Sequence, residues 1–470
     1  MSTSANVAAS GWSTDDPAAS IRPIPASARR LSSFDLAVLW GDLGVGLLVL
    51  AAGALLVPGL GTRDALVATV VGSIIGCALL GLAAYIAADA GVPTMVLTRA
   101  ALGLRGSTLP TVLNVVQLLG WTSFEILVMS QFADRIAQHA GLPALYPVWV
   151  LAVAAFCTAM ALGGPLVVVR QWLEKFGVWA MILTSAALFG LLASRYDLGE
   201  IIGRAGTGDL GFWLAVDIVV SMPLSWFPLV ADYNRFARSR TGSFWGTFVG
   251  YLVANVAFFG LGILATIALQ TDPAGLSGSI VDVLLSGTGV AAWLLGLVAV
   301  LVILADETDN GFANIYSAAV STQNVASRIP QALLIVVVGV IGAGLALVLQ
   351  NTDYEGFLLL IGSVFVPLLG VVAADYLVVR RGRYEPDELF TAGGPYWYSS
   401  GLNLPAIVVW AIGFVLYEWI SGGLVRFGLG WPTDVAIGAT LPSFSVAFAL
   451  YAAMGRLLIR ARLYRNAKST

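Results

Sequence analysis

The chain has 470 residues, of which 58% are hydrophobic and only 11% are charged, and its formal net charge is −3. Soluble domains carry about 25% charged residues, so a bilayer rather than water is the natural solvent for this chain. The mean hydropathy of +0.88 agrees with that reading. Apolar segments run from one end to the other, which predicts one membrane domain. Nothing in the charge points to a nucleic-acid partner.

Twelve apolar segments follow one another along the chain. A membrane-spanning helix needs about 20 mostly apolar residues. We predict spans at 34–58, 64–89, 108–134, 145–163, 171–194, 211–231, 244–269, 289–316, 330–349, 355–379, 402–421 and 435–459. The flanking residues 1–33 and 461–470 are predicted to be flexible tails around a membrane domain of residues 34–460.

Basic residues alternate between the connections of these spans. If the N-terminus lies inside, 19 of the 24 Lys and Arg residues fall on inner segments and 5 on outer ones. Cytoplasmic loops carry the excess of Lys and Arg in membrane proteins. The distribution therefore supports twelve spans in the cell membrane with both termini in the cytoplasm.

Glycine and proline are concentrated in the first and sixth spans, at Gly41, Gly44, Gly46, Gly53, Pro223 and Pro228. A helix that breaks inside the bilayer frees backbone groups, which are tolerated only where they line a cavity or bind a ligand. Two broken helices five spans apart predict an inverted five-plus-five repeat, 34–194 and 211–379, followed by two further helices at 402–459. The alternative is that the glycines allow close packing and the prolines only kink the helices.

Carboxylates at membrane depth usually mark a pathway or a site. Here they are Asp42, Glu125, Asp217, Asp306, Glu307 and Asp309. They lie on the first, third, sixth and eighth spans, which an inverted repeat would gather. For the acidic residues of the eighth span, a water-exposed helix end is the alternative interpretation.

Two short patterns indicate binding chemistry. Trp121 and Glu125 are four residues apart and so share a helix face. A flat aromatic ring beside a hydrogen-bonding group suits a planar heterocycle, although an interfacial Trp would give the same pattern. On the eighth span, Ala305, Thr308 and Asp309 follow helical spacing, with a carbonyl, a hydroxyl and a carboxylate as oxygen ligands that suit a small alkali cation.

Two acidic–basic pairs close helices on the predicted cytoplasmic side. Asp232 with Arg235, and Asp375 with Arg380, are expected to anchor helix ends and lipid headgroups rather than to bind a substrate. The chain also lacks a Walker loop, a GxSxG motif and a Cys/His cluster. It is therefore not expected to be an enzyme or to need a cofactor, and transport would draw on an ion or substrate gradient.

Four motifs in order resemble the type-one nucleobase–cation symporters, the permeases for cytosine/purines, uracil, thiamine and allantoin. They are WGDLGVG, GWTSFE, PLVADYNRFARS and TDNGFANIYSAAVS, and the likeness runs from about residue 30 to 460. The resemblance is strongest to cytosine permeases. It implies the all-helical sodium-symporter fold with the inverted repeat, in which spans one, two, six and seven rock against spans three, four, eight and nine.

The resemblance also implies site residues. Trp121 would stack on the base, Glu125 would bind its edge where several relatives carry Gln, and Trp226 or the backbone near Ser221 and Ser225 would close on it. The family asparagine of the eighth span falls at Asn314.

A sodium site would use Ala305, Thr308 and Asp309 with helix-one carbonyls near Gly41 and Gly44. Because sodium-coupled relatives have a hydroxyl residue at the position of Asp309, the coupling ion is left open between sodium and a proton.

The functional prediction is import of a nucleobase or related heterocycle by cation symport, with a cytosine-like aminopyrimidine or a purine first. The alternatives are hydroxymethylpyrimidine, allantoin or hydantoin as the substrate, or an amino-acid or amine symporter of the same fold. A monomer is expected by analogy with transporters of this size.

Overall fold

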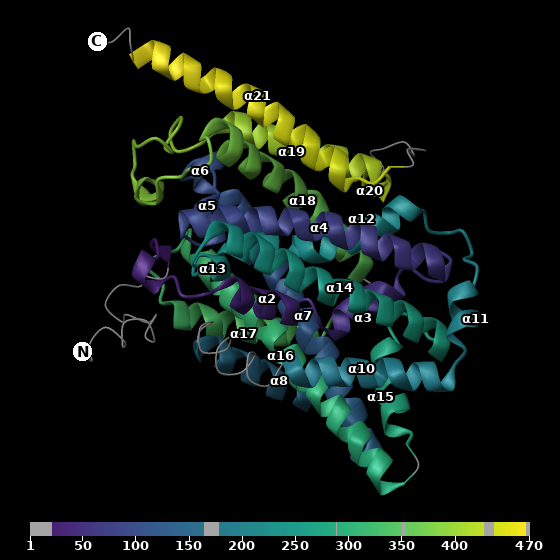
Figure 1. Cartoon of the computed structure of the whole chain (residues 1–470). Helices are drawn as coiled ribbons and strands as arrows, with labels where there is room; N and C mark the ends of the chain where they lie inside the picture. The colour runs from purple at the N-terminus through teal and green to yellow at the C-terminus, as the bar shows by residue number, and fades with distance from the viewer. Residues whose placement is uncertain (1–20, 164–177, 288, 350–353, 427–436, 467–470) are drawn as a thin grey trace.

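The computed structural model describes residues 21–163, 178–287, 289–349, 354–426 and 437–466. In this part of the chain β-structure is limited to isolated bridges, and all other regular structure is helical. The elements in chain order (Figure 1) are η2 (Ala26–Ala28), α2 (Ser33–Asp42), α3 (Leu47–Ala54), α4 (Thr62–Ala90), α5 (Thr94–Leu97), α6 (Arg99–Leu102), α7 (Thr108–His139), α8 (Tyr146–Gly163), α10 (Val178–Arg195), α11 (Leu198–Gly203), α12 (Phe212–Ser225), η4 (Phe227–Leu229), α13 (Val230–Asn234), α14 (Arg240–Leu269), α15 (Leu276–Leu285), α16 (Val290–Gln323), α17 (Gln331–Ala346), α18 (Tyr354–Ala374), η6 (Asp375–Val379), η7 (Pro386–Phe390), α19 (Leu404–Ile420), α20 (Gly423–Arg426) and α21 (Thr440–Asn466).

Every predicted span contains a helix, although residues 171–177 of the fifth range and 435–436 of the twelfth lie outside the described residues. Seven of the described helices are long and apolar enough to cross a membrane, and the bent pair α2 and α3 would make an eighth. Large apolar side chains face outward, with Leu151, Leu183, Val253 and Val340 each at least 64% exposed. Such a surface suits contact with lipid.

The first predicted span is broken, as its glycines indicate. Helices α2 and α3 are bent by 62° across residues 43–46. The sixth predicted span behaves differently, because α12 passes through the 3₁₀ turn η4 into α13 without a bend sharp enough to separate them. The α-helix is thus interrupted in both spans, but only the first is sharply bent; in the sixth, Pro223 lies within α12 and Pro228 within η4.

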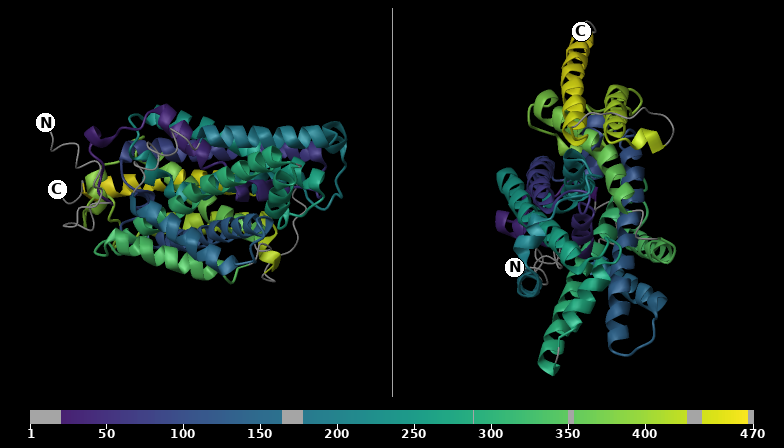
Figure 2. Two further views of the ribbon diagram at one scale, coloured as in Figure 1. Left: turned by 90° about the horizontal axis from the view of Figure 1, so that it is seen from below. Right: turned by 90° about the vertical axis from the view of Figure 1, so that its right-hand side faces the viewer.

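The helices pack in two groups that meet at the centre. Helix α14 packs against α2, α3 and α4, and α4 packs against α12. Helices α7, α8, α16 and α17 pack against one another in the second group, while α18, α19 and α21 form a layer in which α18 packs against α12 of the first group (Figure 1). Most of the long helices lie roughly along one axis, and the start of α2 and the end of α21 lie toward the same end of the molecule (Figures 1 and 2).

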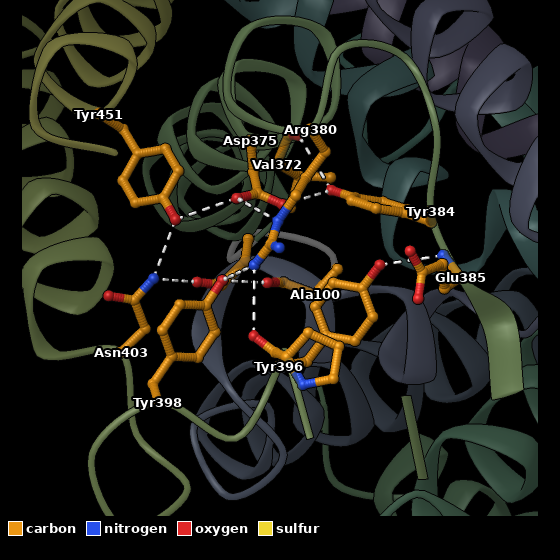
Figure 3. Close-up of polar contacts among 12 residues, drawn as sticks. Ala100, Val372, Asp375, Arg380, Tyr384, Glu385, Tyr396, Tyr398, Asn403 and Tyr451 are labelled. Atoms are coloured by element: carbon orange, nitrogen blue, oxygen red, sulfur yellow. Dashed lines mark hydrogen bonds and ion pairs between the residues drawn. The ribbon is translucent and has the colours of Figure 1, made fainter. Parts of the chain in front are cut away.

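A polar network around Asp375 ties three helices together at that end (Figure 3). Its carboxylate accepts hydrogen bonds from the Tyr384 hydroxyl at 2.9 Å and from the Tyr451 hydroxyl at 3.1 Å. Asn403, which begins α19, donates to the same Tyr451 oxygen at 2.9 Å. Arg380 lies 3.9 Å from Asp375 and closes the network. Helices α18, α19 and α21 are thereby joined through one buried carboxylate.

The prediction that the acidic–basic pairs anchor helix ends is confirmed, but the predicted headgroup contact is wrong for Asp232, Arg235 and Asp375. Asp375 is fully buried in this network, and Asp232 and Arg235 are also buried. Asp232 accepts the backbone N–H of Thr94 at 3.1 Å, which holds α13 against α5. Both carboxylates are taken up in contacts between helices, which leaves them no access to lipid.

Part of the predicted N-terminal tail is also packed against the helices. Ile24 donates its N–H to the carbonyl of Gly91 at 2.8 Å, and Arg29 donates to the carbonyl of Ala88 at 2.7 Å. Gly91 ends α4 with a φ of +64°, a conformation that favours glycine. Residues 21–31 thus cover the end of α4, and residues 1–20 lie outside the described residues.

Close helix contact at Gly53 generates a stability prediction. A Cβ at this position would collide with the backbone of Phe259 on α14, whereas a Cβ on Gly344 of α17 would meet nothing within 4 Å. We expect Gly53→Ala to destabilise the protein by about 1–3 kcal/mol through overpacking. The matched Gly344→Ala change should be neutral or stabilising, because alanine is the better helix former. Thermal unfolding of both purified variants checks this, and equal melting temperatures would contradict it.

Candidate functional site

The break in the first span leaves backbone groups that need partners inside the membrane domain. Helix α16 supplies two of them: the Asn310 side chain donates to the carbonyl of Val45 at 3.0 Å, and Glu307 accepts the N–H of Leu47 at 2.7 Å. Gly46 lies between these contacts, and a Cβ there would be 3.0 and 3.1 Å from the two Glu307 carboxylate oxygens. A side chain at this position would push the Glu307 carboxylate away, so glycine favours the close approach of α16 to the break.

A small cavity opens beside the break. It is lined by Leu43, Val45, Gly46, Leu48, Val49, Trp121, Glu125, Met222, Ser225, Trp226, Glu307, Asn310 and Asn314. The free space amounts to about 20 Å³, which is enough for roughly one water molecule. Binding of anything larger requires the surrounding helices or side chains to move apart.

Two tryptophans from opposite helix groups line this cavity. Trp121 on α7 meets Phe357 of α18 edge-on, with ring centroids 5.2 Å apart, and its indole N–H has no hydrogen-bond partner within the described residues. Trp226, which follows α12, donates its indole N–H to the Tyr251 hydroxyl at 2.9 Å. The two rings are thus held by different helix groups, and relative motion of the groups would change the space between them.

The cavity gathers most of the residues that the sequence analysis named for a substrate. Trp121, Glu125, Ser225, Trp226 and Asn314 all line it. Ser221 does not, because it lies one turn back on α12 and donates its hydroxyl to the carbonyl of Asp217 at 2.8 Å.

Eight of the lining residues were not named as substrate ligands, and two of them, Glu307 and Asn310, carry polar side chains. A signal for two of them was present, because Glu307, Asn310 and Asn314 follow the three- and four-residue spacing of one helix face.

The proposed cation residues lie on the adjoining face of α16. The Thr308 hydroxyl donates to the carbonyl of Ala305 at 2.6 Å. Asp42, the last residue of α2, lies beside Asp309. The charge of Asp306 also acts on the Asp42 carboxylate. The four side-chain oxygens of Asp42 and Asp306 accept no hydrogen bond from the described residues. Carboxylates brought together in this way need a proton or a cation to balance their charge.

Two other observations concern the cation site. Gly41 and Gly44 face α14, where a Cβ would meet Gly250 and Ala254 respectively, so their Cα atoms serve helix packing. Among the described residues, no group of three or more His, Cys, Asp and Glu side chains is arranged to hold a metal ion.

The alternative of a water-exposed acidic helix end is wrong. Asp306, Glu307 and Asp309 are 5%, 1% and 0% exposed, and α16 continues to Gln323, well past the predicted end at residue 316. These carboxylates lie in the interior, between the two helix groups.

Comparison with known proteins places the chain. The model of the family described as permease for cytosine/purines, uracil, thiamine and allantoin matches residues 23–440. A putative purine-cytosine permease of Bacillus subtilis is 24% identical, over 90% of this chain and 93% of its own length. A cytosine permease of Escherichia coli is 28% identical, over 85% of this chain and 88% of its own.

A solved structure has the same fold. It is that of Mhp1, a nucleobase-cation-symport-1 family transporter in a closed conformation with bromovinylhydantoin bound, and it has a TM-score of 0.78, 20% identity and coverage of 94% of both chains. Together with the apolar helices, the match identifies a multi-pass membrane transport protein and not an enzyme. The chain belongs to the family of permeases for cytosine/purines, uracil, thiamine and allantoin.

Proposed function

We propose that the protein is a secondary active transporter that imports a nucleobase or related heterocycle by symport with sodium or protons. A cytosine-like aminopyrimidine or a purine is the first candidate. The observation that carries this proposal is the meeting of Trp121, Glu125, Trp226 and Asn314 around one cavity at the break between α2 and α3. Two aromatic faces with a carboxyl and an amide beside them suit a flat ring with polar edges.

In the proposed complex, the base lies between the rings of Trp121 and Trp226, and Glu125 and Asn314 bind its edge. Transport follows by rocking of the group α2, α3, α4, α12 and α14 against the group α7, α8, α16 and α17. Support comes from the packing of these helices in two groups and from the position of the cavity between them. Because the cavity holds only about 20 Å³, the base enters a wider conformation than this one.

The finer architecture is part of the same proposal. It comprises twelve spans, with an inverted repeat of residues 34–194 and 211–379. The protein lies in the cell membrane, and both of its termini lie in the cytoplasm. Nineteen basic residues on the predicted inner segments, against five on the outer ones, support this orientation. The working unit is proposed to be a monomer.

Other heterocycles are also candidate substrates. The family description includes uracil, thiamine and allantoin, and the solved relative holds bromovinylhydantoin. Allantoin and hydantoins therefore stand next to cytosine and purines as candidate substrates, together with the hydroxymethylpyrimidine named from the sequence.

The stacking role of Trp121 is testable by binding. We expect purified wild-type protein to bind a labelled base saturably, and Trp121→Ala to weaken binding at least about tenfold through loss of ring contact. Trp179→Ala is the matched control, since Trp179 is 62% exposed on α10. Its affinity should equal that of the wild type. Equal affinity of the Trp121 variant, or the same loss in both variants, would contradict the stacked site.

The coupling ion is proposed to act at Asp309. Its carboxylate lies beside Asp42 at the end of α2, so a cation or proton bound there joins α16 of one group to α2 of the other. Ala305 and Thr308 would complete a sodium site with carbonyl and hydroxyl oxygens. If the ion is a proton, the pair of carboxyls holds it between them.

Uptake into proteoliposomes tests this role. We expect the base to accumulate above its external concentration under an inward sodium gradient or an inward proton gradient, and Asp309→Asn to equilibrate the base without accumulating it. Glu418→Gln, in α19, changes a carboxyl that is 7% exposed and lies outside the two groups, and it should accumulate normally. Accumulation by Asp309→Asn equal to that of the wild type would rule out a coupling role for this carboxyl.

A further inference from the structure

Glu307 brings a second carboxyl into the substrate cavity. It is 1% exposed and lines the cavity together with Glu125. One Glu307 oxygen accepts the N–H of Leu47, while the other has no hydrogen-bond partner in the described residues, and neither does Oε2 of Glu125. The two carboxyls line the same small cavity. The site therefore presents acceptor oxygens that a bound molecule can use.

The same contact closes a place where an anion would bind. Where a helix is broken inside the membrane, the N-terminus of its second half attracts anionic substrate groups. The N–H groups there are free, and the helix dipole is positive at that end. In this chain the N–H of Leu47, the first residue of α3, already donates to Glu307 at 2.7 Å. A substrate carboxylate would meet an occupied donor and two carboxyl groups, so charge repulsion opposes its binding.

We propose that Glu307 determines specificity together with Glu125, and that the pair selects heterocycles carrying a ring amino group next to a ring nitrogen. This inference rests on the proposed function and narrows its substrate class. An amino group donates to a carboxylate oxygen, and the neighbouring ring nitrogen, when protonated, donates as well. If the ring carries a carbonyl at that position, its oxygen meets a carboxylate oxygen of the protein. Both are hydrogen-bond acceptors, so both stay unpaired in a buried site.

Matched ligand pairs test the selection directly. Cytosine and uracil differ in an amino group against a carbonyl at one ring position, as do adenine and hypoxanthine, and orotate is uracil with an added carboxylate. Competition against a labelled base on the purified full chain should give wild-type affinity at least about tenfold higher for the amino member of whichever pair binds. Orotate and free amino acids should not compete.

The variant Glu307→Gln separates specificity from folding. Its amide oxygen still accepts the N–H of Leu47, but its amide nitrogen adds a donor and the negative charge is lost. We expect the preference for the amino member to fall to within about threefold, with the oxo member binding as well as before or better. Glu418→Gln is the control for loss of a buried carboxyl and should keep the wild-type preference.

A second variant keeps the test decisive if Glu307→Gln does not fold. Gly46→Ala places a methyl group 3.0 and 3.1 Å from the two Glu307 oxygens and should displace that carboxylate, with the same loss of preference.

Binding of heterocycles without an amino preference in the wild type, or an unchanged preference in both variants, overturns the role of Glu307 and leaves the proposed function standing. Binding of orotate as tightly as uracil does the same. If no heterocycle binds at all, the proposed function itself fails and the inference fails with it.

Discussion

The structure depends on one constraint, the need to satisfy backbone groups where the first span breaks inside the membrane domain. In a bilayer an unpaired N–H or C=O costs several kcal/mol, so the break between α2 and α3 is possible only with partners brought from elsewhere. Helix α16 provides them through Asn310 and Glu307, three residues apart on one face. Gly46 favours this close approach. The cavity lies beside this break, and residues of the break, of α7 and of α16 line it.

Helix α16 also joins the two chemical roles of the proposed transporter. Glu307, Asn310 and Asn314 face the cavity, while Asp309 on the adjoining face lies beside Asp42 of α2. In the proposed transporter, a cation or proton bound at those carboxylates would act on the same two helices that shape the cavity. Coupling between ion and substrate then needs no long pathway, since α2 and α16 belong to opposite groups and both ligands act across the line where the groups meet.

The positions of the helices could be predicted from the sequence, because the length of apolar segments and the placement of Lys and Arg are strong signals. Each predicted range contains a helix, and the glycines of the first span correctly indicated a break. The sixth span was harder, since proline 223 and proline 228 are compatible with a kink, a 3₁₀ turn or a full break, and only packing decides among them.

Among the site residues, those marked by local spacing were predicted from the sequence, and those that depend on distant contacts were not. Trp121 and Glu125 were found from helical spacing, whereas Ser221 was misplaced because its hydroxyl turns back to its own helix. The role of Glu307 depends on a contact with Leu47, 260 residues away in the chain. No local pattern predicts such a contact. For the same reason the burial of Asp375 was missed, because its partners come from α21 and from the segment between α18 and α19.

The most direct test of the central claim is an experimental structure of the full chain in a bilayer nanodisc with a saturating base. The account predicts density for a flat ring between Trp121 and Trp226, with its polar edge within hydrogen-bond distance of Glu125 and with Glu307 still bound to the N–H of Leu47. Ligand density elsewhere, as in the separate cavity between α12 and the start of α21, or a Glu307 carboxylate turned away from α3 in the complex, would contradict it.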